Sequence, residues 1–83
     1  MNWQLVRSQH TLDMILALPI EGQLALLELI EALETDPYSV TEPYGIDDKI
    51  TRQALFGRGS GLAVLFVNAI TRRITMLSLT WTG

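Results

Sequence analysis

The spacing of apolar residues changes along this chain, and this change constrains the fold more than any other feature. Up to about residue 35, apolar residues recur every three or four positions, as they do on one face of an α-helix. From residue 51 onward, they form short runs rich in β-branched and aromatic residues, which are typical of strands. The sequence therefore predicts helices followed by strands in a single domain over residues 1–83, because this length has room for one core.

Two helices are predicted in the first half, after a short strand over 2–7. Ser8 is a good N-cap for the first helix, which Pro19 ends near residue 18, because an interior proline removes a hydrogen bond. The second helix is expected over 20–35. Its apolar face carries Leu26, Leu29, Ile30 and Leu33. The two helices would form a hairpin whose apolar surface must pack on the rest of the chain.

Three strands are predicted in the second half, over 51–56, 62–67 and 73–81. The middle run, LAVLFV, is apolar throughout, which is typical of a central strand that is covered on both faces. The segment 39–49 contains prolines and glycine and is predicted to be a loop. The predicted fold class is α+β with the order β-α-α-β-β-β.

The glycine-rich run FGRGSG, at residues 56–61, has two interpretations. Glycines can shape a loop that binds phosphate, but such a loop leads into a helix and here the next segment is a strand. Glycines also supply the positive φ angles of a tight turn. The context favours a β-hairpin turn.

The composition excludes several classes of protein. The sequence has no cysteine, so it has neither disulfide bonds nor thiolate metal sites. The single histidine has no grouped ligands beside it, and we expect no metal ion and no cofactor. We see no secretory leader and no apolar run approaching the ~20 residues of a membrane helix. We therefore expect a cytoplasmic protein without membrane contact.

Charged residues are distributed unevenly along the chain. Nine acidic and six basic residues give a net charge of −3, and no acidic residue follows Asp48. The second half instead carries Arg52, Arg58, Arg72 and Arg73. This asymmetry predicts an acidic face and a basic face, and the basic face could approach phosphate.

Five features of the sequence occur together in one order. They are NWQLV at 2–6, the Leu18-Pro19 break, LETDPY at 33–38, FGRGSGLAVLFV at 56–67 and RITMLSLTW at 73–81. In this order they resemble the RelE/ParE superfamily, the toxins of type II toxin–antitoxin systems. The stretch EPYGIDD at 42–48, followed by Thr51-Arg52, resembles a small actinobacterial-type branch of that group.

The resemblance implies a fold and a set of partners. In this family a helical hairpin packs on one face of a twisted, mainly antiparallel four-stranded sheet, whose first and last strands lie near the centre. The concave side of the sheet is the working surface. RelE-like members are mRNA interferases, endoribonucleases that cleave message on the ribosome and inhibit translation without a metal. ParE-like members bind DNA gyrase and have no catalytic residues. The implied partners are a cognate antitoxin and either ribosome and mRNA or gyrase, with a homodimer as a further option.

The predicted site residues are arginines of the second half. By the resemblance, Arg52, Arg58 and Arg73 would hold phosphate during RNA cleavage. The alternative for Arg52 and Arg58 is a solvated strand residue that pairs with Asp47 or Asp48.

A second hypothesis of function comes from a departure from the family. The family's arginine at the start of the central strand falls at Leu62 or Ala63, and neither side chain can bind phosphate. The second hypothesis is therefore a non-catalytic binding module that retains the toxin fold and acts through protein–protein contacts.

The other candidates are single side chains. His10 lies in the first turn of the first predicted helix, away from the sheet surface where a general base would be needed. Trp3 and Trp81 are expected to pack at the ends of strands. An exposed Trp81 would instead be a stacking platform or a partner anchor.

Overall fold

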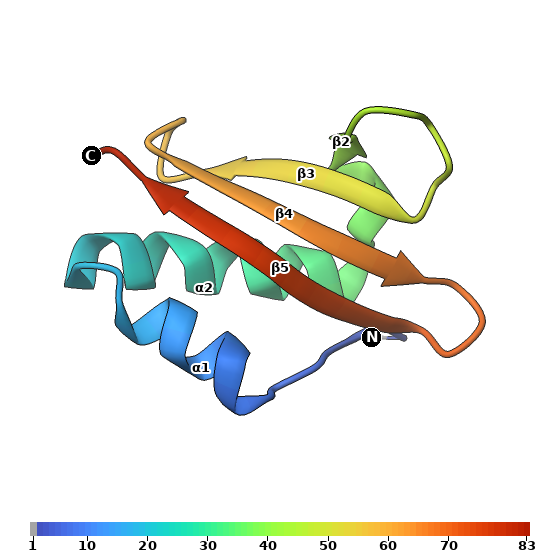
Figure 1. Ribbon diagram of the computed structural model, residues 1–83, viewed down its shortest axis with the longest axis horizontal. Coiled ribbons are helices and arrows are strands. Elements are labelled where there is room, and N and C mark those ends of the chain that lie inside the picture. The colour runs from blue at the N-terminus through green and yellow to red at the C-terminus, as the bar shows by residue number, and fades with distance from the viewer. Residues whose placement is uncertain (1) are drawn as a thin grey trace.

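The computed structural model describes residues 2–83, which form two layers, a helical hairpin and a five-stranded sheet (Figure 1). The elements are β1 (Gln4–Leu5), α1 (Gln9–Leu16), α2 (Ile20–Thr35), the 3-10 helix η1 (Pro37–Ser39), β2 (Glu42–Pro43), β3 (Thr51–Phe56), β4 (Gly61–Asn68) and β5 (Arg73–Trp81). The α+β class and the order of the main elements are as predicted. No helix within the described range has the length and apolar character needed to span a membrane.

The sheet has the strand order β1-β5-β4-β3-β2. Strands β3, β4 and β5 form an antiparallel meander, and β4 is the middle strand, as its continuous apolar run predicts. The first strand lies at an edge rather than near the centre, so that implication of the resemblance is wrong here. β1 pairs in parallel with the start of β5 through Gln4 and Leu5 only, and the other side of β5 is occupied by β4.

The predicted loop 39–49 contains a short strand, which gives the sheet its fifth member. β2 pairs with β3 in the antiparallel sense, with Glu42 opposite Gln53. After β2, Asp48 Oδ1 accepts hydrogen bonds from the backbone N–H groups of Thr51 (2.9 Å) and Ile50 (2.8 Å). These bonds return the chain into β3, and they lower the pKa of Asp48 below its ordinary value because they stabilise the carboxylate.

The lowered pKa of Asp48 predicts an acid-dependent loss of stability. A group with a lowered folded pKa stabilises the protein above its unfolded pKa, and this contribution is lost as the pH falls through the folded pKa. As the pH is lowered past about 4, the melting temperature should therefore decrease. Asp48→Asn should lack the part of this decrease that is due to protonation of Asp48. Asp47→Asn removes the neighbouring charge and should retain it. Melting curves between neutral and acidic pH measure the difference, and identical acid profiles for wild type and Asp48→Asn would contradict the assignment.

The ends of the helices follow the sequence signals. Ser8 Oγ accepts a hydrogen bond from the backbone N–H of Thr11 at 3.2 Å, which confirms Ser8 as the N-cap of α1. Pro19 is the N-cap residue of α2, and the break between the helices falls at this proline, as predicted, although α1 already ends at Leu16.

The core lies between the helices and the inner face of the sheet. Side chains at alternate positions of a strand point to the same face, and those that face the helices are buried. From β3, β4 and β5 they are Ala54, Phe56, Ala63, Leu65, Val67, Ile74 and Met76. From α2 they are Leu26, Leu29, Ile30 and Leu33, the predicted apolar face. Arg52 also lies on this side, and Leu79 and Trp81 pack against the core while partly buried. The positions that alternate with these residues point away from the helices.

Candidate functional site

The side of the sheet that faces away from the helices is its open surface. Its side chains form cross-strand rows through β3, β4 and β5, set by the strand register. Its three central rows are Thr51, Phe66 and Thr75, then Gln53, Val64 and Ser78, then Leu55, Leu62 and Thr80, and Asn68 and Arg73 form a further row at one end of the face. Leu55 is 66% exposed and Phe66 is 43% exposed, so large apolar side chains are in contact with solvent.

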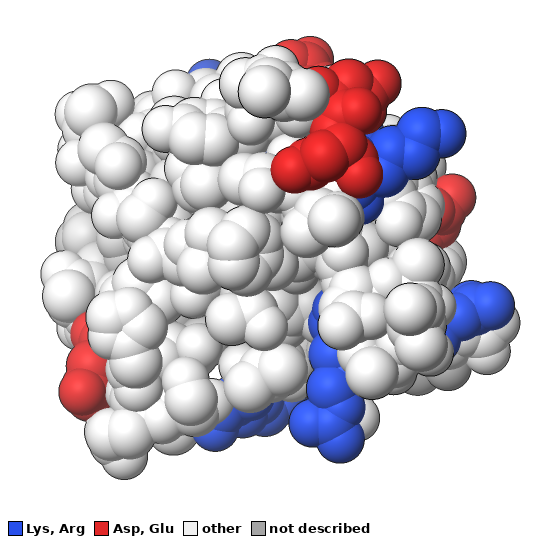
Figure 2. Space-filling model, turned by 45° about the vertical axis from the view of Figure 1, so that its right-hand side comes forward, with Lys and Arg blue, Asp and Glu red and all other residues white. Residues whose placement is uncertain are grey.

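None of the residues in the three central rows of this face is charged. The nearest charged strand residues lie at its margins: Glu42 in β2 is paired with Gln53, and Arg73 in β5 is paired with Asn68. In Figure 2, which brings the right-hand loops of Figure 1 forward, charged side chains surround a wide uncharged surface. The predicted basic face is therefore not formed on the sheet.

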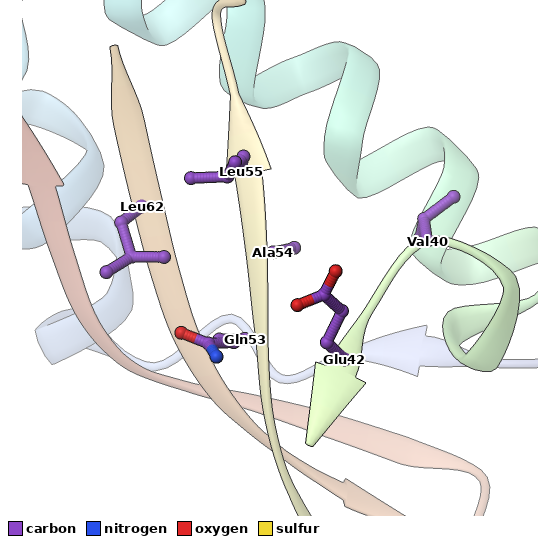
Figure 3. A pocket seen from close by; sticks show the side chains of 6 residues that line it. All are labelled: Val40, Glu42, Gln53, Ala54, Leu55 and Leu62. Atoms are coloured by element: carbon purple, nitrogen blue, oxygen red, sulfur yellow. The ribbon is translucent and has the colours of Figure 1, made fainter. Parts of the chain in front are cut away.

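A pocket of about 330 Å³ lies at the free edge of β3, beside β2 (Figure 3). It is lined by Val40, Glu42, Gln53, Ala54, Leu55 and Leu62. The carboxylate of Glu42 is the only ionisable group among these residues. Gln53 donates a hydrogen bond from Nε2 to the carbonyl oxygen of Pro43 at 3.2 Å, which fixes its amide. A single carboxylate without a cation is not an arrangement for acid–base chemistry on a phosphodiester.

The side chain of Arg52, a predicted phosphate ligand, lies on the inner side of β3 rather than on the outer face. It is 7% exposed. Its Nε donates to Thr41 Oγ1 at 2.6 Å and its Nη2 donates to the carbonyl oxygen of Thr41 at 2.9 Å. The guanidinium carbon lies 5.2 Å from the ring centre of Tyr38. Arg52 faces inward because side chains two residues apart in a strand point to the same face, and Ala54 is buried in the core.

The ion pair considered for Arg52 and Arg58 is also not formed. Within residues 2–83, the one ion pair joins Arg7 and Glu34 at 3.7 Å. Glu34 also accepts a hydrogen bond from the backbone N–H of Leu5 at 3.0 Å, and so ties α2 to β1. Glu34 therefore has a structural role in joining the two layers.

Arg58 and Arg73 lie at opposite ends of the sheet. Arg58 is in the turn between β3 and β4, with a φ of 58°, and Arg73 begins β5 beyond the far end of β4. β4 is eight residues long, which corresponds to about 26 Å at ~3.3 Å per residue. No single phosphate can contact both side chains. The structure therefore does not bring Arg52, Arg58 and Arg73 together.

Of the two residues aligned with the family's arginine, Leu62 lies on the outer face and Ala63 does not. Leu62 points outward and is partly exposed, whereas Ala63 is fully buried in the core. Leu62 is therefore the residue that stands where an arginine could have reached a ligand on the sheet. His10 is exposed on α1, in the layer of helices on the other side of the sheet.

Two arginines, Arg52 and Arg72, form cation–π contacts with aromatic rings. These contacts are not predicted from the sequence. Arg52 lies over Tyr38, Tyr38 packs edge-on against Trp3 with ring centres 5.7 Å apart, and Arg72 lies 5.2 Å over Trp3. The buried Thr41, which anchors Arg52, carries no sequence signal of its role either. These contacts join Trp3, just before β1, with residues of η1, β3 and the turn before β5, which are far apart in the chain.

Arg52 is expected to contribute to stability. Arg52→Ala should lower the free energy of unfolding by about 2 kcal/mol, because the buried Thr41 carbonyl loses its donor and a cavity is left. Part of the loss is offset, since the variant no longer buries a charge. Urea unfolding measures the effect, and Arg58→Ala, at an exposed turn, is the control that should change little. Equal stability of the two variants would contradict a structural role for Arg52.

Two solved structures share the fold over almost the whole chain. The RelE toxin of the toxin–antitoxin complex RelBE2 from Mycobacterium tuberculosis has a TM-score of 0.78 at 16% identity, with 98% of this chain and 99% of that chain covered. The RelE of the archaeal RelE–RelB complex from Pyrococcus horikoshii OT3 has a TM-score of 0.68 at 19% identity, with 100% and 98% covered. The chain has the RelE fold. No protein-family model matches the sequence, and no curated protein is significantly similar to it.

The likeness to the two structures covers the fold, and it carries over no side chain of the outer face. At 16% and 19% identity, the three chains share the path of the backbone and few side chains. The chemistry of the site has to be read from this chain's own residues, and in the three central rows of its outer face these are apolar or uncharged polar.

Proposed function

We propose that this protein is the toxin component of a type II toxin–antitoxin system, that it binds a cognate antitoxin, and that it acts through protein–protein contacts. The first part is supported by the agreement with two RelE structures, each solved as a complex with a RelB partner. The mode of action is supported by one observation above all, the uncharged central rows of the outer face of the sheet.

Cleavage of mRNA on the ribosome is the competing mode of action. Such cleavage needs a base for the 2′-hydroxyl, cations for the charge that develops on the phosphate, and an acid for the leaving oxygen. The outer face offers hydroxyl groups of threonine and serine and the amide of Gln53. A nuclease would have to rely on Arg58 or Arg73 alone, each at a different end of the sheet.

Contact with a protein suits the outer face better than contact with RNA. Phe66 and Leu55 expose apolar side chains that can serve as anchors in a protein interface. The surrounding hydroxyl and amide groups can form hydrogen bonds at the rim. RNA binding, in contrast, depends on cations that contact the backbone phosphates, and on the outer face the strands offer only Arg73, at one end. Gyrase is a second protein target that such a surface could contact.

The proposal is tested with the product of the reading frame that adjoins the gene. Co-expression should yield a stable complex, and induction of this chain alone should arrest growth that the neighbouring product restores. If the two proteins do not associate at micromolar concentration and induction leaves growth unchanged, the toxin assignment is wrong.

A further inference from the structure

The guanidinium group of Arg52 is a buried cation without a compensating anion. Its two hydrogen-bond acceptors, Thr41 Oγ1 and the Thr41 carbonyl oxygen, are both neutral. Among residues 2–83, the one ion pair lies elsewhere, so Arg52 has no carboxylate partner in the described part of the chain. A buried positive charge is unfavourable unless it is paired, and a bound anion would relieve this cost.

The third nitrogen of Arg52, Nη1, is free to bind a ligand. No hydrogen bond is formed by Nη1 to residues 2–83. Nη1 is also not fully enclosed. In the described range, Trp81 Nε1 is the one side-chain polar atom that is fully buried and has no hydrogen-bond partner. Nη1 therefore reaches solvent, and Arg52 lines a pocket of about 450 Å³.

The same pocket contains a second cation. It is lined by Tyr38, Pro43, Asp47, Lys49 and Arg52. Two cations therefore face one carboxylate, that of Asp47, which forms an ion pair with neither cation. The bonds to Thr41 and the ring of Tyr38 hold the guanidinium in place, so little side-chain entropy is lost when a ligand binds.

We propose that this pocket binds an oxyanion, a carboxylate or phosphate group, between the guanidinium of Arg52 and the ammonium of Lys49. A planar guanidinium with a free N–H edge matches the oxygen atoms of either group. None of the five residues that line this pocket belongs to the three central rows of the outer face. The site does not rest on the proposed function, because it follows from the surroundings of Arg52 alone.

Titration with two small probes tests the site. The ¹⁵N-labelled protein is titrated with sodium phosphate and, separately, with sodium acetate, while sodium chloride keeps the ionic strength constant. We expect saturable binding in the millimolar range and a shift of the Arg52 Nε–H signal. Binding of phosphate alone indicates a phosphoryl ligand, and binding of acetate alone indicates a carboxylate from an acidic segment. Either result supports the site.

Matched variants locate the binding without disturbing the core. Lys49→Gln should weaken binding of the probe about fivefold, because it removes one of the two cations. Arg58→Gln changes the net charge equally at an exposed turn outside the pocket, and should leave the affinity unchanged. The proposal is overturned if neither probe binds saturably, if the Arg52 signal does not move, or if both variants weaken binding alike.

Discussion

Gly57→Ala should lower the free energy of unfolding by about 3 kcal/mol, because it combines backbone strain with a steric clash. Gly57 has a φ of 61°, which disfavours residues with a Cβ atom. A Cβ at this position would lie 2.6 and 2.8 Å from Cζ3 and Cη2 of Trp81. Trp81 has little room to move, since its ring stacks on Phe56 and packs closely on Gly22 of α2. A Cβ added at Gly22 would lie only 3.1 Å from Cδ2 of Trp81.

The melting temperature measures this prediction, and the same turn supplies the control. In a domain of this size, 3 kcal/mol corresponds to a fall of roughly 12–24 °C. Gly59 has a φ of 89° but nothing within 4 Å of an added Cβ, so Gly59→Ala should cost only about 1 kcal/mol. In a Trp81→Leu background, the cost of Gly57→Ala should fall towards that of Gly59→Ala. If the two glycine variants melt at the same temperature, Trp81 is not wedged against the turn.

Leu55→Asp together with Phe66→Asp should weaken antitoxin binding at least a hundredfold, because each removes an apolar anchor and places a charge in the interface. The fold should survive, since these side chains are 66% and 43% exposed and contribute little to the core. Titration calorimetry with the purified antitoxin measures the affinity, and the melting temperature of the free variant verifies the fold.

A matched control separates the outer face from general surface charge. Ile70 is 95% exposed in the turn between β4 and β5, outside the rows of the outer face. Ile70→Asp introduces one of the two charges at a still more exposed apolar residue and should retain the wild-type affinity. An outer-face double variant that binds as tightly as Ile70→Asp would remove the outer face from the antitoxin interface.

The sequence predicts the main elements well because local signals define them. Ser8 and Pro19 set the ends of the helices through hydrogen bonds and sterics that involve near neighbours in the chain. FGRGSG is a hairpin turn, as predicted, with Gly57, Arg58 and Gly59 all at positive φ. β2 escaped prediction, because its two residues carry a proline and pair only through the register of β3.

The site is less predictable, because it depends on which side of a strand each residue faces. The arginines are numerous in the second half of the sequence, but Arg52 alternates with the core and Arg58 and Arg73 lie at opposite ends of the sheet. A prediction from composition cannot separate these positions. Within β3 the signal exists, because Arg52 has the same parity as the buried Ala54 and Phe56.

We propose that the protein acts through protein–protein contacts and does not cleave RNA. A cleavage assay on ribosomes tests this mode of action. Purified protein is incubated, at amounts well below those of the ribosomes, with translating ribosomes and a labelled message, beside an active RelE toxin as the positive control. We expect an intact message with this protein and a cleaved one with the control. Codon-specific cleavage by this protein, lost in Arg58→Ala or Arg73→Ala, would contradict this mode of action.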